Sequence, residues 1–194
     1  MSDTRRTEEL DGWASVGAQA STSLLRCGAL DQSEASLVWT GKEIVAADGA
    51  VIACDYYHEF RVTSLVDRLP ADELIPFWRE LFRVCRHAAV VCVSGAYWTH
   101  VDVCADPTRR RGLSERMFMY LSEAGRAVIS SDPCDDALAT KQLAGIDFHM
   151  TKIVRITENE WDTRSADAKE WGLRHYFNVA RRIEFVLAVC KKPA

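Results

Sequence analysis

The feature that most constrains how this chain can fold is an amphipathic helix pattern followed closely by an unbroken apolar run. After a helix-start signal at residues 70–72, apolar residues recur at the spacing of one helix face: Leu74, Phe77, Trp78, Leu81, Phe82 and Cys85. Residues 88–93 (AAVVCV) follow and end at a Ser-Gly pair. Continuous apolar strands are typical of sheets that helices cover on both faces. We therefore expect a helix packed on a buried strand.

Other segments predict how this unit is extended. Short apolar or alternating runs predict strands at 42–47, 51–54, 60–66, 147–157 and 183–190. Ser114 can cap a helix over residues 115–124, which Gly125 would end. Strands that alternate with helices, followed by a late strand pair, predict the α/β class. We expect a Rossmann-like, mostly parallel sheet flanked by helices, with one antiparallel strand near the C-terminal edge.

Composition narrows the class of protein. The chain has 194 residues, of which 48% are apolar and 27% charged, as in ordinary globular proteins. We expect a polar leader over residues 1–20 and a single domain over residues 21–194. The net charge of −4 argues against general nucleic-acid binding. No apolar run approaches the roughly 18–20 residues of a membrane span, and the first ten residues lack the apolar core of a signal peptide.

The cysteines bear on compartment and on metal binding. There are seven, an odd number, and no CxxC pair occurs. This pattern indicates reduced thiols and a cytoplasmic location. His100, Asp102 and Cys104 are close in sequence, but their spacing matches no strong zinc pattern, so no metal site is predicted.

Two segments, in this order along the chain, resemble the sequences of a known family. Residues 69–84 follow the pattern LP..EL..F.RE..RV, and residues 106–121 begin with DPT and carry E..F.YL. With the HYFNV segment at 175–179, they make residues 60–190 similar to the C-terminal half of class I S-adenosylmethionine-dependent methyltransferases. The small forms found in bacteriophages are the most similar. The resemblance implies S-adenosylmethionine as cofactor, an unidentified methyl acceptor, and the host cytoplasm if the chain is phage-encoded.

The resemblance also implies where the cofactor would bind. The family has a glycine-rich turn after its first strand, where glycines let the backbone approach the ligand. The best match, residues 24–29, keeps Gly28 alone and has Arg26 where a small or apolar residue is usual. Glu43 would hold the cofactor ribose, and Asp55 would lie near the adenine. Each acid has the alternative of an exposed charge at a strand end.

The loop over residues 97–111 is the predicted substrate side, because ligands of open α/β sheets bind beyond the carboxyl ends of the strands. His100 or Asp102 would remove a proton from a nucleophilic N or O. The predicted substrate-binding residues are Tyr97, Trp98, Asp106 and Arg109. The relatives carry His where Arg109 stands. Alternatively, the aromatic residues only cover the core and the charges are solvated.

Two main hypotheses follow. In the first, the chain is an S-adenosylmethionine-dependent methyltransferase, which the largely intact substrate-side half of the resemblance, within residues 60–190, favours. In the second, it is a catalytically inactive protein of that fold that works as a binding or structural module, which the degenerate glycine turn favours. A third class, an unrelated α/β nucleotide-binding protein, also stays open. A P-loop is excluded, since Gly41-Lys42 lacks the upstream glycine and precedes Glu43.

Overall fold

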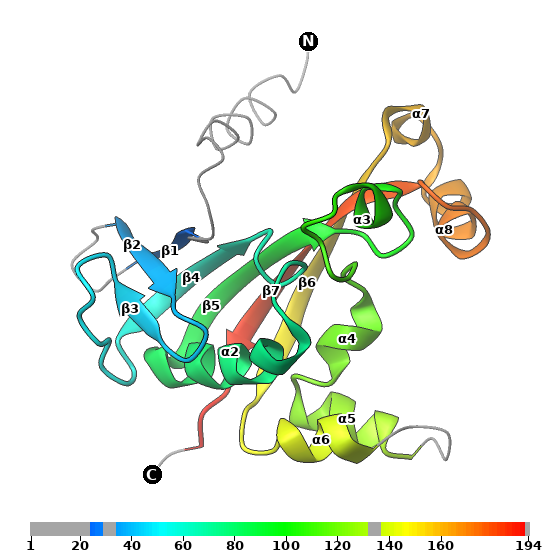
Figure 1. Ribbon diagram of the computed structural model, residues 1–194. Coiled ribbons are helices and arrows are strands. Elements are labelled where there is room, and N and C mark those ends of the chain that lie inside the picture. The colour runs from blue at the N-terminus through cyan, green and yellow to red at the C-terminus, as the bar shows by residue number, and fades with distance from the viewer. Residues whose placement is uncertain (1–23, 29–33, 132–136, 193–194) are drawn as a thin grey trace.

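The computed structural model describes residues 24–28, 34–131 and 137–192. These residues form one seven-stranded sheet in the order β3-β2-β1-β4-β5-β7-β6 (Figure 1). The strands are β1 (Leu24–Gly28), β2 (Glu34–Trp39), β3 (Ile44–Ala46), β4 (Tyr57–Thr63), β5 (Cys85–Ala96), β6 (Phe148–Thr157) and β7 (Ala180–Val189). The helices are α2 (Ala71–Val84), α3 (Asp102–Ala105), α4 (Glu115–Met119), α5 (Glu123–Ile129), α6 (Ala137–Gln142), α7 (Asn159–Asp162) and α8 (Ala166–His175). The leader predicted over residues 1–20 lies outside the described residues.

The α/β class is confirmed, but the expectation of a mostly parallel sheet is wrong. Of the six strand pairs in the described part, one is parallel, β4 with β5 across α2. A parallel neighbour needs a crossover of about a dozen residues or more. Only residues 29–33 join β1 to β2 and only 40–43 join β2 to β3, so these strands are antiparallel. The predicted antiparallel strand near the C-terminal edge is β7.

Helix α2 forms as the apolar stripe predicts. Its residues Phe77, Trp78, Leu81 and Val84 are buried. The Trp78 ring lies 5.7 Å from Phe118 of α4 and 5.8 Å from Phe148 of β6 in edge-on contacts. Phe118 also stacks on Phe185 of β7 at 3.7 Å. These contacts place the core between the sheet and one layer of helices (Figure 1).

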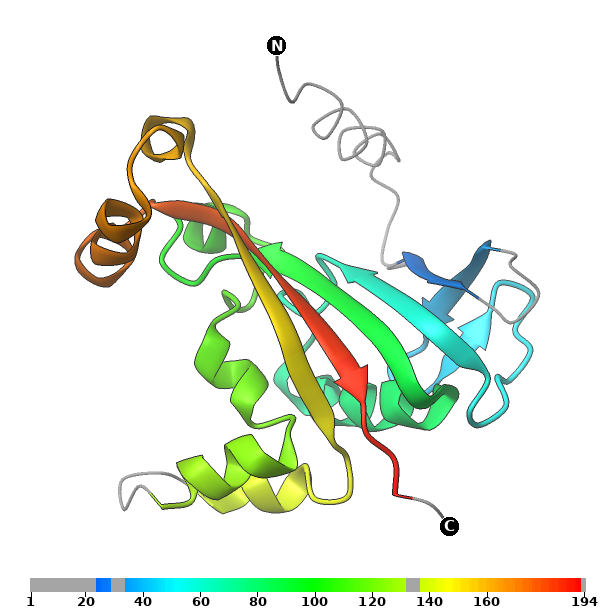
Figure 2. The same ribbon diagram turned by 180° about the vertical axis from the view of Figure 1, so that it is seen from behind.

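The other face of the sheet carries no described helix, as the view from behind shows (Figure 2). Strand β5 therefore buries only alternate residues of its apolar run: Ala89, Val91 and Val93 are buried, whereas Val90 is 41% exposed. The prediction that this run is buried on both faces is wrong. A sheet with mostly antiparallel pairing can leave one face to water.

Local corrections concern three further predictions. Residues 51–54 form no strand and contribute one isolated bridge, Val45 with Val51. Ser114 caps α4 as predicted, accepting a hydrogen bond from the Met117 N–H. The predicted helix at 115–124 is instead two helices, because Ser122 caps α5. Gly125 lies inside α5, where a Cβ would collide with a backbone carbonyl of α4.

None of the described helices is both long and apolar enough to cross a membrane.

Candidate functional site

A charged cluster lies where the parallel strands β4 and β5 end. Asp67 follows β4 and is fully buried, and its Oδ2 accepts a hydrogen bond from Arg109. Arg68 Nη2 lies 2.9 Å from Asp106 Oδ2, and Arg109 Nε lies 3.2 Å from the same oxygen. We call Asp67, Arg68, Asp106 and Arg109 the Asp67 cluster. Two predicted substrate-binding residues, Asp106 and Arg109, thus come together, but they bind each other.

Backbone contacts tie the loop to this cluster. The Asp67 carbonyl accepts the N–H groups of Arg110 at 2.8 Å and of Arg111 at 3.2 Å. A Cβ on Gly95 would lie 2.8 Å from Leu113 Cδ1 and 3.3 Å from Asp67 Cγ, so glycine lets β5 approach the cluster. The Asp67 cluster therefore fastens the predicted substrate loop to the core.

The pKa of Asp106 shows that this carboxyl stays ionised. Hydrogen bonds from the Thr108 hydroxyl and N–H, together with the charges of Arg68 and Arg109, lower that pKa to about 2. A carboxylate with so low a pKa is a weak proton acceptor at neutral pH. Asp106 is suited to holding the loop and not to general-base chemistry.

The two predicted catalytic residues lie together at the same edge. His100 is buried, its Nε2 lies 2.8 Å from Glu158 Oε1, and its Nδ1 accepts the Asp102 N–H at 3.1 Å. Because Nδ1 accepts, Nε2 carries the proton and donates to Glu158. The Asp102 carboxylate accepts from Arg181 Nε at 3.2 Å. Both ring nitrogens of His100 are thus engaged within the protein.

The other two predicted substrate residues lie side by side, with ring centroids 6.3 Å apart, but differ in exposure. Tyr97 is buried and pairs with Leu113, whereas Trp98 is half exposed. Tyr97 therefore covers the end of the core, whereas Trp98 presents its ring to solvent.

The predicted cofactor residues do not come together. Gly28 pairs with Glu59 near the start of β4, and Asp55 precedes β4 and binds Lys191. Glu43 lies on the turn between β2 and β3, where its backbone binds Thr40. Gly28 and Asp55 lie toward the edge at which β4 begins, and the predicted substrate loop lies where β4 ends. At about 3.3 Å per residue, Gly28 lies about 13 Å from the end of β4, and Asp55 lies more than about 20 Å from it.

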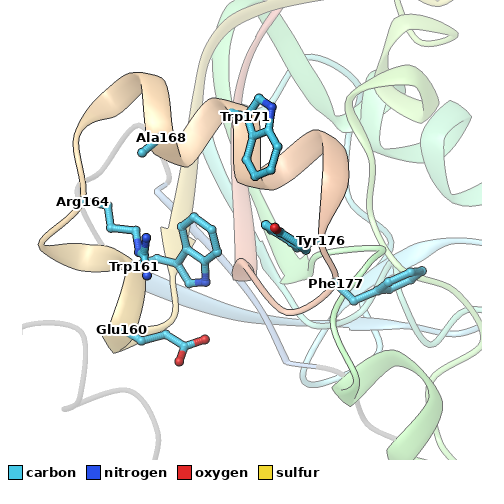
Figure 3. A pocket seen from close by; sticks show the side chains of 7 residues that line it. All are labelled: Glu160, Trp161, Arg164, Ala168, Trp171, Tyr176 and Phe177. Carbon is cyan, nitrogen blue, oxygen red and sulfur yellow. The ribbon is translucent and has the colours of Figure 1, made fainter.

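Two hollows lie at the carboxyl edge, beside α7 and α8, which join β6 to β7. The polar hollow, about 590 Å³, is lined by His100, Asp102, Glu158, Glu160, Asn178 and Arg181 among others. The aromatic hollow, about 480 Å³, is lined by Glu160, Trp161, Arg164, Ala168, Trp171, Tyr176 and Phe177 (Figure 3). Glu160 lines both, so the two hollows adjoin.

The aromatic hollow was missed by sequence reasoning. Trp171, Tyr176 and Phe177 expose 52%, 51% and 75% of their surface, which is unusual for large apolar side chains grouped together. Trp161 is buried against Gly172, where a Cβ would lie 2.5 Å from the indole. The signal that could have found it is four large aromatic residues within the otherwise polar segment 158–178.

Comparison with known proteins gives only distant likenesses. No family model and no curated protein matches this chain. A solved S-adenosylmethionine-dependent methyltransferase from Archaeoglobus fulgidus is 9% identical, with a TM-score of 0.42, over 71% of this chain and 61% of that one. An arsenic(III) S-adenosylmethionine methyltransferase from Chlamydomonas reinhardtii is 15% identical, with a TM-score of 0.36, over 76% of this chain and 42% of that one. This chain thus spans less than two thirds of either structure, and neither likeness assigns it a family or an activity.

Proposed function

We propose that this chain is a non-catalytic binding module, the second of the two main hypotheses drawn from its sequence. The observation that carries the proposal is the separation, along β4, of two predicted cofactor residues, Gly28 and Asp55, from the predicted substrate loop. The third, Glu43, follows the end of β2, which lies at the same edge as that loop and away from the other two. Methyl transfer needs the acceptor atom, the methyl carbon and the sulfur in line, with reacting atoms about 3–3.5 Å apart. Groups at opposite edges of a strand cannot meet this requirement.

S-adenosylmethionine does not fit the residues predicted to hold it. A cofactor turn uses the backbone N–H groups that open a helix after the strand. Gly28 instead pairs with Glu34 of β2, and residues 29–33 are too few for a crossover helix. Asp55, predicted to lie near the adenine, is neutralised by Lys191. The residues predicted to hold the cofactor therefore do not line a common binding site.

The acid–base groups of the loop are also committed to other contacts. Both nitrogens of His100 are bonded within the protein, Asp102 is paired with Arg181, and Asp106 is held ionised in the Asp67 cluster. What the carboxyl edge offers instead is hollowed surface with exposed aromatic rings. Such surface is typical of ligand binding.

Calorimetry with S-adenosylmethionine and S-adenosylhomocysteine tests the proposal. We expect no saturable heat and no change of melting temperature at millimolar ligand, with an active methyltransferase as the positive control. Saturable binding at micromolar strength would overturn it. Glu43→Ala and Asp55→Ala variants would then show whether the predicted ribose and adenine carboxylates carry that binding.

A further inference from the structure

We propose that the aromatic hollow binds an alkylated ammonium group, the chemistry shared by choline and methylated lysine; this inference rests on the proposed binding function. Cations with a diffuse charge bind well to the faces of aromatic rings, and tryptophan is the best of these. The hollow contains two tryptophans, a tyrosine and a phenylalanine, together with one carboxylate, Glu160, and one guanidinium, Arg164.

The arrangement of the rings favours a rounded cation over a flat ligand. The ring centroids of Trp171 and Tyr176 are 5.2 Å apart with 73° between the planes, and those of Trp161 and Tyr176 are 6.1 Å apart at 45°. Figure 3 shows these three rings gathered at different angles, with Glu160 to one side. A planar base stacks on one face, whereas a trialkylammonium group presents positive surface in several directions at once.

The chain itself already places a cation on one of these rings. The Arg164 guanidinium carbon lies 4.7 Å from the centroid of the Trp161 ring. This distance lies within the roughly 6 Å range of cation–π attraction. The Trp161 face therefore accepts a delocalised positive charge in this setting.

Charge favours a cationic ligand over an anionic one. Glu160 is exposed, and its side chain forms no ion pair or hydrogen bond within the described residues. Its neighbours are engaged: Glu158 binds His100, and Glu170 binds Arg174. The segment 158–178 carries five carboxylates against three Lys and Arg residues. A cation bound at the rings would gain Glu160 as its counter-ion.

The two tryptophan rings, Trp161 and Trp171, are held in place before any ligand arrives. The His175 ring stacks on Trp171 at 4.4 Å, and His175 Nδ1 lies 2.7 Å from the Trp171 carbonyl oxygen. Gly172 lets α8 pack directly on Trp161. Preorganised rings reduce the entropy lost on binding.

The test titrates the full chain with choline, and separately with 3,3-dimethylbutan-1-ol, which has the same shape without the charge. We expect saturable choline binding with a Kd of about 1 mM or tighter, and binding at least about fivefold weaker for the uncharged isostere. Trp171→Ala should weaken choline binding by about tenfold and Glu160→Gln by about threefold. Tyr56→Ala, which removes an exposed ring outside the hollow, is the matched control and should leave it unchanged.

Several outcomes would overturn the inference: no choline binding, equal binding of the isostere, or binding that survives both Trp171→Ala and Glu160→Gln. Trimethyllysine and unmodified lysine form a second pair of ligands, and a peptide source is favoured if trimethyllysine binds more tightly than choline. The two proposals fail separately. Absence of choline binding with no micromolar S-adenosylmethionine binding refutes the ligand class alone, whereas S-adenosylmethionine binding at micromolar strength refutes the binding-module function itself. Weaker S-adenosylmethionine binding that Trp171→Ala abolishes would be that of its sulfonium cation in the hollow.

Discussion

Replacing Arg109 separates a structural role of the Asp67 cluster from a substrate-binding one. Arg109→Ala leaves the carboxylate of Asp67 buried, with Arg68 Nη1 at 3.8 Å and the Ala96 N–H at 3.5 Å as its remaining partners. Removing one partner of a buried ion pair costs about 3–5 kcal/mol. Arg109 is 16% exposed, so we expect the lower part of that range, about 3–4 kcal/mol.

Thermal unfolding followed by circular dichroism measures this cost. For a domain of this size each kcal/mol lowers the melting temperature by about 2–4 °C, so we expect a decrease of roughly 6–16 °C. Arg110→Ala is the matched control. Arg110 is the exposed neighbour of Arg109 and contributes only a backbone N–H to Asp67, so the free energy of unfolding should change by no more than about 0.5 kcal/mol.

A double variant completes the test. Asp67→Asn combined with Arg109→Met removes the charge as well as its partner, so it should recover part of the stability that Arg109→Ala loses. Equal melting temperatures for Arg109→Ala and Arg110→Ala would refute the reasoning. Arg109 would then be free to contact a ligand, as its sequence position first suggested.

Three further predictions concern the hollow and the loop. Gly172→Ala should displace the Trp161 ring and cost about 1–3 kcal/mol, visible as a lower melting temperature and altered tryptophan fluorescence; unchanged values would contradict this contact. Arg164→Gln should strengthen choline binding about threefold by freeing the face of Trp161, and weaker binding in calorimetry would show that the guanidinium assists the ligand. Because the pKa of Asp106 is lowered to about 2, its stabilising contribution is complete above the unfolded value near pH 4 and is lost as pH falls through 2. Asp106→Asn should therefore flatten this part of the melting-temperature profile, and a profile as steep as that of the unchanged chain would count against it.

The elements predicted best are those specified by local pattern. The stripe in α2 and the side-chain hydrogen bond at Ser114 depend on residues within a few positions of each other. Periodicity and capping act at that range, so the sequence carries them directly. The alternation of Ile183 to Val189 likewise predicted the buried face of β7.

Predictions that depended on strand direction were less successful. Apolar residues such as those of β1 and β2 suit parallel and antiparallel neighbours alike, so composition did not reveal the hairpins. The consequence is large, because reversing β1 relative to β4 carries Gly28 to the edge opposite the predicted substrate loop. The uncovered face of β5 has the same origin, since hairpins supply no crossover helices to cover it.

By itself, the sequence determined the α/β class, the α2–β5 unit and the antiparallel last strand, because periodicity and chain order express short-range physics. Only the tertiary structure decided which charged residues meet. Asp67 and Arg109 are distant in sequence yet share a buried ion pair, and Trp161 and Tyr176 meet only when α7 and α8 fold together. Contacts of this kind depend on long-range packing, and here they fasten the predicted substrate loop to the core beside the aromatic hollow.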